Sequence, residues 1–344
     1  MKLFQNLKEI PVTSLPGLRI GNAQDYDAMT GVTVLLFDQG AKVGVDISGG
    51  GPASRETPLA NPLTADNPIN AIVLSGGSAY GLAASDGVMR YLEEHGIGYE
   101  TGFAKVPLVL QSCIYDLGIG RADVRPDAAM GYAACVDAEK NHPVSGIIGG
   151  GCGASVGKIC GREIATKTGL GIYAVSAGEL MIAAVVVLNA LGDIYDPSTG
   201  RQIAGPRKPH GSGFYDSREE FYKLTQQTDL FAKKGSSADN HGDTPADHST
   251  ADATHPLTGG NTTISAIITN GRFSKAELNK LASMTRCAYA RCINPVGTMA
   301  DGDSIYAASI GTVPADLNMT GTLAAEVMAE AIQIAVKAAK RPEG

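Results

Sequence analysis

Several patterns that commonly reveal a protein's partner are missing from this sequence of 344 residues. No run of basic residues is longer than two, and the formal net charge at pH 7 is −7. Neither a nucleic acid nor an anionic membrane surface is therefore an expected partner. The longest apolar run, Met181 to Leu188, is too short to span a bilayer. Residues 1–9 have no long apolar region and no small-residue cleavage site, so we expect no secretory signal and a cytoplasmic protein.

Cysteine and histidine number only six each, and neither forms a familiar metal-binding pattern. The histidines include no HExxH or similar motif. The cysteines include no CxxC pair and have mostly apolar or small neighbours, which predicts buried free thiols. We expect neither a metal nor another cofactor. The cysteines are Cys113, Cys135, Cys152, Cys160, Cys287 and Cys292.

Glycine, by contrast, is abundant, with 43 residues. Such a content indicates many tight turns and places where the backbone approaches another backbone or a ligand. Hydrophobic residues make up 44% of the chain and charged residues 18%, which is typical of a globular protein with a sizeable core. The length suits two ordinary domains or one large sandwich.

The first half of the chain shows strand patterns and two glycine-rich segments. Runs over 31–37 and 42–47 are separated by Asp38-Gln39-Gly40, which predicts a hairpin. A strand over 71–74 leads through the glycine loop 75–81 into a helix. That order is one in which ligands often bind, which makes Gly77 and Ser78 candidate substrate-binding residues. The alternative is that these glycines only allow close packing of strand and helix.

Other elements are predicted from apolar periodicity and cap residues. The run from about 226 to 260 is polar and predicts a flexible linker or surface loop. Ser274 and Glu277 form a capping-box pattern at the start of a helix. The expected helices cover about 82–94, 127–140, 274–291 and 323–339, and the further strands 169–177, 181–188, 304–309 and a strand that begins at Thr262.

The second glycine-rich segment, 149–158, invites three motif interpretations. It fits GxGxxA, but no long helix or suitably spaced acid follows for a dinucleotide. It fails the P-loop pattern at Cys152 and at Ile159. It fits GxSxG around Ser155, which would make Ser155 a hydrolase nucleophile. That motif needs a helix directly after it, whereas Gly157 and Gly161 favour a hairpin.

The junction of Asn261 and Thr262 is the most unusual feature. The polar run ends at Asn261, and an apolar, β-branched strand begins at Thr262. If the bond between them were cut, Thr262 would carry a hydroxyl nucleophile and a free α-amine as its own base. Asn261-Thr262-Thr263 also fits the N-glycosylation pattern, which has no meaning without a secretory signal.

Three further candidates have ordinary interpretations when each is taken alone. Asp301-Gly302-Asp303 fits a plain turn. Lys158 fits a solvated lysine. Asn189, which closes an apolar strand, fits a turn former, although such an amide can also stabilise an oxyanion.

Six segments, taken together and in order, carry a family resemblance. The segments are Gly49-Gly50-Gly51-Pro52 with Arg55-Glu56-Thr57, Gly76 to Gly81, Arg125-Pro126-Asp127, Ser155 to Lys158, Asn261 to Ile264, and Asp301-Gly302-Asp303. They resemble the family of L-aminopeptidase/D-esterases and β-peptidyl aminopeptidases. The resemblance runs from about residue 17 to residue 340, and the C-terminal part is most similar to 6-aminohexanoate-oligomer (nylon-oligomer) endohydrolases.

The resemblance implies an α/β fold, a four-layer αββα sandwich of the N-terminal-nucleophile type that processes itself. The cut would fall between Asn261 and Thr262. It would give a large subunit, 1–261, which includes the linker, and a small subunit, 262–344, both within one sandwich domain. The resemblance also implies a homo-oligomer, a tetramer of such heterodimers.

The family's functional residues transfer to matching positions of this sequence. Thr262 would be the nucleophile in both self-cleavage and turnover, and Asp301 and Asp303 would orient it. Lys158 would control the protonation of the nucleophile, and Asn189 would donate a hydrogen bond to the oxyanion. Tyr115 would line the substrate site.

The resulting hypothesis is an amidohydrolase that cleaves short peptides or amide oligomers with unhindered, linear acyl parts, including nylon-type oligomers, through an acyl-enzyme on Thr262. No acidic residue can be assigned to hold a substrate's free amine, which leaves the substrate open. Two alternatives remain. One is an ornithine-type acetyltransferase with the same nucleophile, and the other is an uncleaved, non-catalytic protein that binds a ligand in its glycine-lined pocket.

Overall fold

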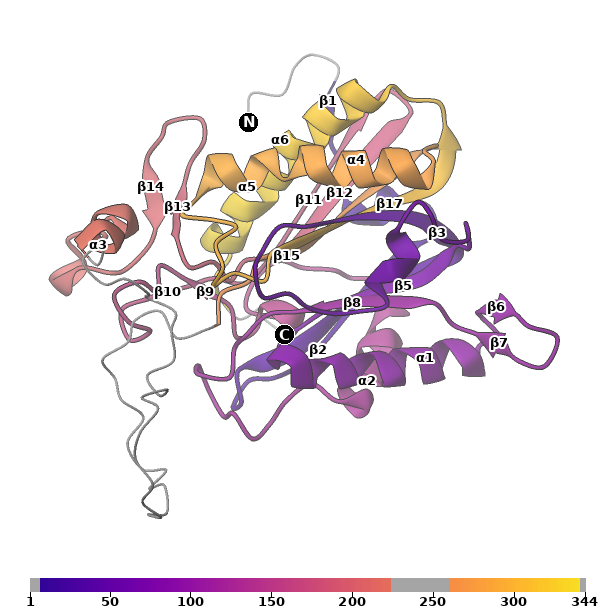
Figure 1. The fold of residues 1–344 in the computed structure, drawn as a ribbon, viewed down its shortest axis with the longest axis horizontal. Coiled ribbons are helices and arrows are strands. Elements are labelled where there is room, and N and C mark those ends of the chain that lie inside the picture. Colours follow the sequence, from indigo (N-terminus) through magenta and orange to yellow (C-terminus); the bar gives the residue numbers. More distant parts are fainter. Residues whose placement is uncertain (1–6, 224–259, 341–344) are drawn as a thin grey trace, which may run out of the picture.

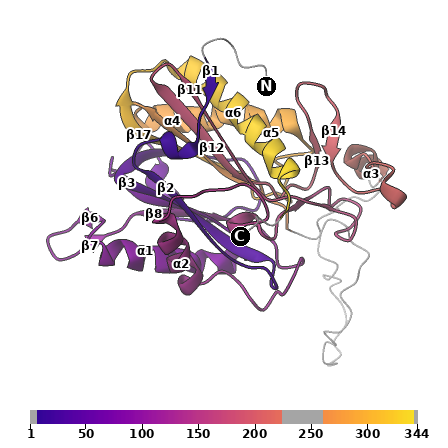
Figure 2. The same ribbon diagram turned by 180° about the vertical axis from the view of Figure 1, so that it is seen from behind.

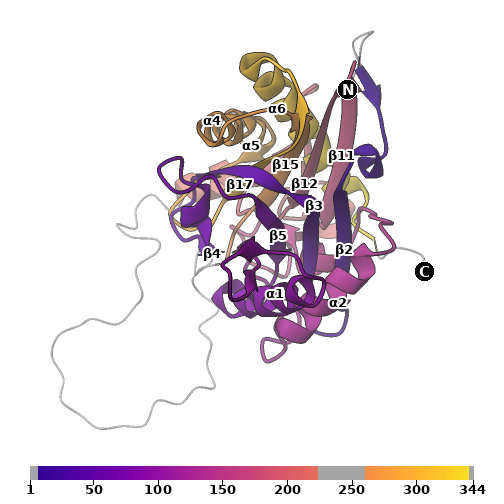
Figure 3. The same cartoon turned by 90° about the vertical axis from the view of Figure 1, so that its right-hand side faces the viewer.

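The computed structural model describes residues 7–223 and 260–340. In this part of the chain, two β-sheet layers pack face to face, and helices cover both outer faces (Figure 1 and Figure 3). The predicted linker lies outside the described residues, apart from Gly260.

The first sheet layer carries the strands around the Asn261–Thr262 junction. Its order is β1-β11-β12-β15-β17 followed by the second half of β3, and α4, α5 and α6 cover its outer face (Figure 1). Figure 2 shows β1 beside β11 at the edge. The elements are β1 (Leu7–Glu9), β11 (Leu170–Ala177), β12 (Leu180–Val187), β15 (Ile264–Gly271), β17 (Ser304–Val313), α4 (Lys275–Thr285), α5 (Cys287–Cys292) and α6 (Leu317–Lys337).

The second sheet layer continues through the first half of β3, with α1 and α2 on its outer face (Figure 3). There β3 pairs with β2 on one side and with β5 on the other, and β5 is followed by β8 and β4. The elements are β2 (Leu18–Asp25), β3 (Thr30–Ile47), β4 (Ala53–Arg55), β5 (Ile69–Ser75), β8 (Val109–Cys113), α1 (Ala84–Glu94) and α2 (Ala128–Ala138).

Short elements connect and edge this sandwich. A hairpin of β9 and β10 and a three-stranded sheet of β13, β14 and β16 lie near the start of β15 (Figure 1). They are β6 (Tyr99–Glu100), β7 (Lys105–Val106), β9 (Ser155–Val156), β10 (Thr166–Lys167), β13 (Asp193–Tyr195), β14 (Gln202–Ala204), β16 (Ile293–Asn294), α3 (Ser217–Lys223), and the 3-10 turns η1 (Val12–Ser14), η2 (Thr57–Ala60), η3 (Ser78–Ala83), η4 (Gly149–Gly151) and η5 (Pro209–Gly211).

The apolar runs of the central strands follow from burial on both faces. In β12, Ile182, Ala184 and Val186 face the core under α4, α5 and α6, whereas the alternate residues 183, 185 and 187 face the core between the sheets. A strand that is covered on both faces reads as a continuous apolar run because successive side chains point to opposite sides.

The second sheet layer alternates in the same way. In β5, Ile72 and Leu74 enter the core between the sheets, and Ala71 and Val73 pack against α1 and α2. Three separate cores thus lie between four layers. The predicted αββα sandwich is confirmed.

The predicted hairpin at Asp38-Gln39-Gly40 is wrong. Thr30–Ile47 forms one strand of 18 residues with a register shift between Leu36 and Ala41. Before the shift the strand pairs with β2 and β5. After it, Ala41 still pairs with Ile69 of β5, and residues 42–47 pair with β17. The turn-like residues, including Gly40 at φ +73°, make an irregularity at which β3 passes from one sheet layer to the other.

The predicted helices are present with adjusted ends. The capping box of Ser274 and Glu277 is confirmed, and Asp127 caps α2 through the Met130 N–H. The predicted helix over 274–291 is divided into α4 and α5 at Arg286. Among the cysteines, Cys160 is partly buried, Cys287 is exposed, and the other four are buried, so the prediction of buried free thiols is wrong for Cys287.

Helix α6 approaches the sheet most closely at a glycine. By length and hydropathy alone it reaches the threshold for a membrane span, yet 67% of that window is buried inside the fold. A Cβ added to Gly171 of β11 would lie 2.0 Å from the Ala331 carbonyl oxygen of α6. A side chain at position 171 would therefore push α6 away from the sheet.

We expect Gly171→Ala to lower the free energy of unfolding by about 1–3 kcal/mol, because overpacking displaces a whole helix. Thermal unfolding followed by circular dichroism measures the change. Gly51→Ala is the control, since its Cβ would meet only the Asp301 oxygen at 3.9 Å. Equal midpoints for the two variants would contradict the close contact of α6.

Candidate active site

The topology brings three chain segments to one edge of the first sheet layer. β15 runs parallel to β17 with Ile264 opposite Ser304, and antiparallel to β12 with Ile264 opposite Val187. Thr262 lies two residues before Ile264, Asp303 directly precedes Ser304, and Asn189 lies two residues after Val187. Strand pairing alone therefore places these three predicted residues together.

The Asn261 carbonyl group is the centre of this cluster. Its oxygen accepts a hydrogen bond from the Gly302 N–H at 2.9 Å and another from the Thr262 hydroxyl. The Thr262 N–H donates to the Asn189 backbone oxygen at 2.9 Å, and Thr262 is only 5% exposed. The peptide bond at the predicted cut is thus fixed at both its carbonyl and its amide, with the Thr262 hydroxyl against the carbonyl.

Asp301 and Asp303 are buried and bind backbone groups. Asp303 accepts from the Thr263 N–H at 2.6 Å and from the Gly297 N–H at 3.1 Å. Asp301 accepts from the N–H of Thr298 at 2.8 Å and from its hydroxyl at 2.7 Å. Through Thr263, Asp303 holds the residue next to Thr262. This is more than the plain turn that the motif also allows.

The glycine segment 49–51 braces the same two acids. The N–H groups of Ser48 and Gly49 donate to the Asp303 backbone oxygen, and the Gly51 N–H donates to the Asp301 oxygen at 2.9 Å. A Cβ on Gly49 would lie 2.3 Å from the Asp303 nitrogen. Only glycine permits this approach of one backbone to another.

Burial changes the protonation of the two acids. It raises the pKa of Asp301, against the hydrogen bonds from Thr298. It also raises the pKa of Asp303, with the Asp301 charge as the second cause, to about 7. Two carboxylates in one dry site disfavour each other's ionised form. Asp303 consequently titrates where most aspartates stay ionised.

Lys158 is buried beside Asn189. Its ammonium group donates to Asn189 Oδ1 at 2.6 Å, to the Asn189 backbone oxygen at 2.9 Å and to the Gly260 oxygen at 3.3 Å. Burial lowers the pKa of Lys158 well below its usual range, and the Arg162 charge lowers it further. The interpretation as a solvated lysine is wrong, because Lys158 is 4% exposed.

Asn189 uses its side-chain amide to bind three other segments. Its Oδ1 accepts from Lys158 and from the Ser155 N–H at 3.1 Å. Its Nδ2 donates to the Tyr115 oxygen at 3.3 Å and to the Gly260 oxygen at 3.5 Å. At the Asn261 carbonyl, the backbone donor is instead Gly302, which the sequence reasoning did not single out.

Gly302 could have been found from its place between the two aspartates. A Cβ there would lie 2.8 Å from Thr262 Oγ1. The position therefore needs glycine so that its N–H can reach the Asn261 carbonyl while the Thr262 hydroxyl passes alongside.

Tyr115 and Arg162 lie on the other side of Gly260. The Tyr115 ring packs against the Gly260 Cα, and the Arg162 guanidinium lies over that ring with its Cζ 5.1 Å from the centroid. Arg162 was not predicted. Its only signal is a charged pair, Arg162-Glu163, in a loop that follows Lys158.

The loop of Gly77 and Ser78 binds a carboxylate of its own chain. The Gly77 N–H donates to Asp116 Oδ1 at 2.7 Å, and the Thr30 hydroxyl donates to Asp116 Oδ2 at 2.7 Å. Because Asp116 follows Tyr115, this loop fixes the backbone beside Tyr115. Direct contact of Gly77 or Ser78 with a substrate stays a prediction.

Ser155 lacks the setting that a nucleophile elbow requires. The chain after it forms the hairpin of β9 and β10, as Gly157 and Gly161 predicted, and no helix follows directly. Within the described residues its hydroxyl has no hydrogen-bond partner, and so no base to activate it. Its backbone N–H supports Asn189 instead.

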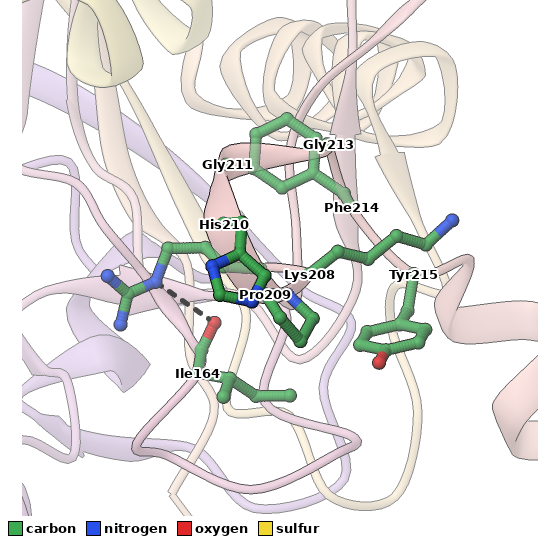
Figure 4. A pocket seen from close by; sticks show the side chains of 9 residues that line it. Ile164, Lys208, Pro209, His210, Gly211, Gly213, Phe214 and Tyr215 are labelled. Carbon is green, nitrogen blue, oxygen red and sulfur yellow. Dashed lines mark hydrogen bonds between the residues drawn. The ribbon is translucent and has the colours of Figure 1, made fainter.

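A cavity of about 550 Å³ is lined by none of the predicted site residues. Figure 4 shows it between Ile164 and the segment that carries His210, Phe214 and Tyr215. The dashed bond is the Arg207 guanidinium donating to the Ile164 oxygen at 3.3 Å. Arg207 also donates to the Glu163 oxygen at 2.8 Å, so it anchors the loop directly after Arg162.

Comparisons with known proteins find matches that cover nearly the whole chain. The sequence profile described as peptidase family S58 matches residues 11–344. A protein of Mycobacterium leprae named uncharacterized aminopeptidase is 31% identical over 364 residues, covering 97% of this chain and 91% of the relative. A 6-aminohexanoate-oligomer endohydrolase of Kocuria sp. is 33% identical over 344 residues, covering 94% and 84%.

A solved structure shares the fold. The L-aminopeptidase D-Ala-esterase/amidase of Ochrobactrum anthropi superposes with a TM-score of 0.64 at 15% identity, covering 96% of this chain and 86% of that one. That protein is described as a variant of the Ntn-hydrolase fold. The likeness confirms the predicted fold class.

We expect the Asp303 carboxyl to take up a proton as the pH falls through about 7. Infrared titration follows the band of protonated carboxyl groups. The component of this band that appears near pH 7 should be absent in Asp303→Asn. Removing the Asp301 charge lowers the pKa of Asp303, so Asp301→Asn should shift the component to lower pH.

Asp193 provides the matched control, since burial raises its pKa to about 6. Asp193→Asn should remove a separate component and leave that of Asp303 in place. A band near pH 7 that survives Asp303→Asn would contradict the assignment.

Proposed function

Because the chain belongs to peptidase family S58 and is therefore a hydrolase of amide bonds, we propose that it cuts itself between Asn261 and Thr262 and then uses Thr262 as its nucleophile. The family resemblance read from the six segments is confirmed by the same matches. Membership in a hydrolase family also opposes the alternative of a non-catalytic binding protein.

The arrangement of the Asn261 carbonyl carries this proposal. Its oxygen lies between the Gly302 N–H and the Thr262 hydroxyl. A backbone donor held in advance at a carbonyl stabilises the negative charge that develops on that oxygen during attack. The nucleophile and the carbonyl belong to adjacent residues, so no diffusion or orientation step is needed.

The self-cleavage step balances as an N-to-O acyl shift followed by hydrolysis. The Thr262 hydroxyl oxygen attacks the Asn261 carbonyl carbon, an ester forms, and the bond to the Thr262 nitrogen breaks. The hydroxyl proton moves to that nitrogen, which becomes the free α-amine. Water then hydrolyses the ester, leaving a carboxyl group on Asn261 and the hydroxyl on Thr262.

Lys158 is the base that this first step needs. Before the cut, Thr262 has no free amine to take its own proton. Burial lowers the pKa of Lys158 well below its usual range, which favours the neutral amine that can accept a proton. Its amine contacts the Asn189 oxygen, which also accepts from the Thr262 N–H. After the cut, the new α-amine takes over as base.

In turnover, the same ester would form with the acyl part of an amide substrate. We propose short peptides and amide oligomers as substrates, with nylon-type oligomers as a secondary activity. Relatives named aminopeptidase and 6-aminohexanoate-oligomer endohydrolase support this range. We also propose an oligomer of cleaved heterodimers, and the cytoplasmic location stays a prediction.

We expect intact mass spectrometry of the purified protein to show two fragments of about 27 and 9 kDa, in proportion to their lengths within 35.5 kDa. Thr262→Ala should give one uncut chain, because the nucleophile is absent. Thr263→Ala is the matched control. It removes a neighbouring buried hydroxyl that has no hydrogen-bond partner among the described residues, and it should still be cut.

An uncut wild type, or fragments in Thr262→Ala, would overturn the proposal. Activity assays then separate the reaction classes. Peptide amides, β-peptides and 6-aminohexanoate oligomers should be hydrolysed by the cut enzyme. Acetyl transfer from acetyl-ornithine to an amine, without hydrolysis of those amides, would identify the acetyltransferase alternative instead.

A further inference from the structure

Gly260 is partly exposed and lies in a narrow space beside the cut. Its carbonyl oxygen accepts from Lys158 at 3.3 Å and from Asn189 Nδ2 at 3.5 Å. A Cβ added to Gly260 would lie 2.4 Å from Tyr115 Cδ1 and 2.7 Å from Arg162 Nη2. Both distances are far shorter than any normal carbon contact, so a side chain fits only if the ring and the guanidinium move.

Hydrogen bonds hold the backbone at Tyr115 in place. The Tyr115 oxygen accepts from Asn189 Nδ2, and the next residue, Asp116, is held by the Gly77 N–H and the Thr30 hydroxyl. Asp116 is 2% exposed. The Tyr115 backbone therefore cannot move away from Gly260 without disturbing this buried network, and the ring can leave only by rotation about its side-chain bonds.

Arg162 is confined on two sides. Its guanidinium lies over the Tyr115 ring and so close to Gly118 that a Cβ there would be 2.2 Å from Nη1. Behind it, Arg207 binds the oxygens of Glu163 and Ile164. The guanidinium therefore narrows the space over Gly260, and Gly118 provides the room that it occupies.

The chain's own segment indicates where a substrate lies. Self-cleavage and turnover form the same kind of ester on the same Thr262 oxygen. The acyl part of a substrate must then lead away from that oxygen as Gly260-Asn261 does in the uncut chain. Counting back from the attacked carbonyl carbon, the Gly260 Cα is the fourth backbone atom.

We infer that Tyr115 and Arg162 form a clamp that selects substrates whose acyl chain has an unsubstituted CH₂ at this fourth atom. The inference rests on the proposed nucleophile Thr262. Peptides with glycine at the position of Gly260 satisfy the clamp, and so do unbranched acyl chains long enough to have a CH₂ at the fourth atom, such as a 6-aminohexanoyl unit. An L-amino acid with a side chain at this position meets both the clamp and the unfavourable φ of +124° that Gly260 adopts.

Two p-nitroanilides that copy the chain's own segment test the clamp. They are N-acetyl-Gly-Asn-p-nitroanilide and N-acetyl-Ala-Asn-p-nitroanilide, and release of p-nitroaniline is followed by absorbance. We expect self-cut wild type to prefer the glycyl probe by at least about tenfold in kcat/KM, the effect of one overpacked methyl group. Arg162→Ala should reduce that ratio by opening the space.

Two further variants assign the cause. Arg162→Lys keeps the charge but removes the planar group from Gly260, so it should reduce the ratio as Arg162→Ala does. Arg218→Ala removes an arginine that pairs with Asp216 outside the site, and it should leave the ratio unchanged. These variants keep Gly260 and so do not depend on the folding of a chain altered at the cut.

Self-cleavage provides the second measurement. Gly260→Ala should slow the appearance of the fragments by at least about tenfold. The double variant Gly260→Ala with Arg162→Ala should recover part of the rate. Circular dichroism of both variants confirms that each is folded before rates are compared.

The outcomes separate this inference from the proposed function. A wild type that never cuts itself contradicts the function. A wild type that cuts itself but accepts both probes equally, or neither of them, contradicts the clamp and leaves the nucleophile in place. An unchanged glycyl preference in Arg162→Ala also overturns the clamp.

Discussion

The pairing of β15 with its two neighbours is the constraint on which the candidate site depends. The parallel partner, β17, starts at the same edge as β15, and the antiparallel partner, β12, ends there. The residues that flank these strand ends meet because of the register, without any recognition between their side chains. A shift of one residue would turn every side chain of β15 to the opposite face.

Burial at these strand ends changes the pKa values of the ionisable residues of the candidate site. Two acids and a lysine are withdrawn from water, and their pKa values move toward the neutral forms, upward for Asp301 and Asp303 and downward for Lys158. In water these groups would be fully ionised at neutral pH and poor at exchanging protons. Burial moves their pKa values toward neutral pH, and a group transfers protons most efficiently when its pKa lies near the working pH.

Local patterns predicted the strands, the helices and Thr262, whereas the four layers and the roles of the other site residues followed from the resemblance to a known family. Apolar runs and cap residues mark the strands and helices, and Thr262 stands out at a sharp change of composition. The hairpin at Gly40 failed because turn residues do not show which partners the flanking runs will find. The roles of Gly302 and Arg162 were not predicted for a similar reason, since they come from contacts with Asn261 and Gly260 that the fold creates. Gly302 lies inside the Asp-Gly-Asp motif, but the motif does not show that its N–H reaches the Asn261 carbonyl.

A chain that must cut itself is its own first substrate, and this links its sequence to its specificity. Residues 260 and 261 have to fit the site while they are still covalently attached to Thr262. A side chain that the surrounding loops exclude at position 260 of the uncut chain is therefore also excluded from later substrates that bind along the same path. Tyr115 and Arg162 thus impose the same constraint on the chain, which needs glycine before Asn261, and on its substrates. A change in the clamp that admits bulkier substrates should also relax the need for glycine in the chain itself.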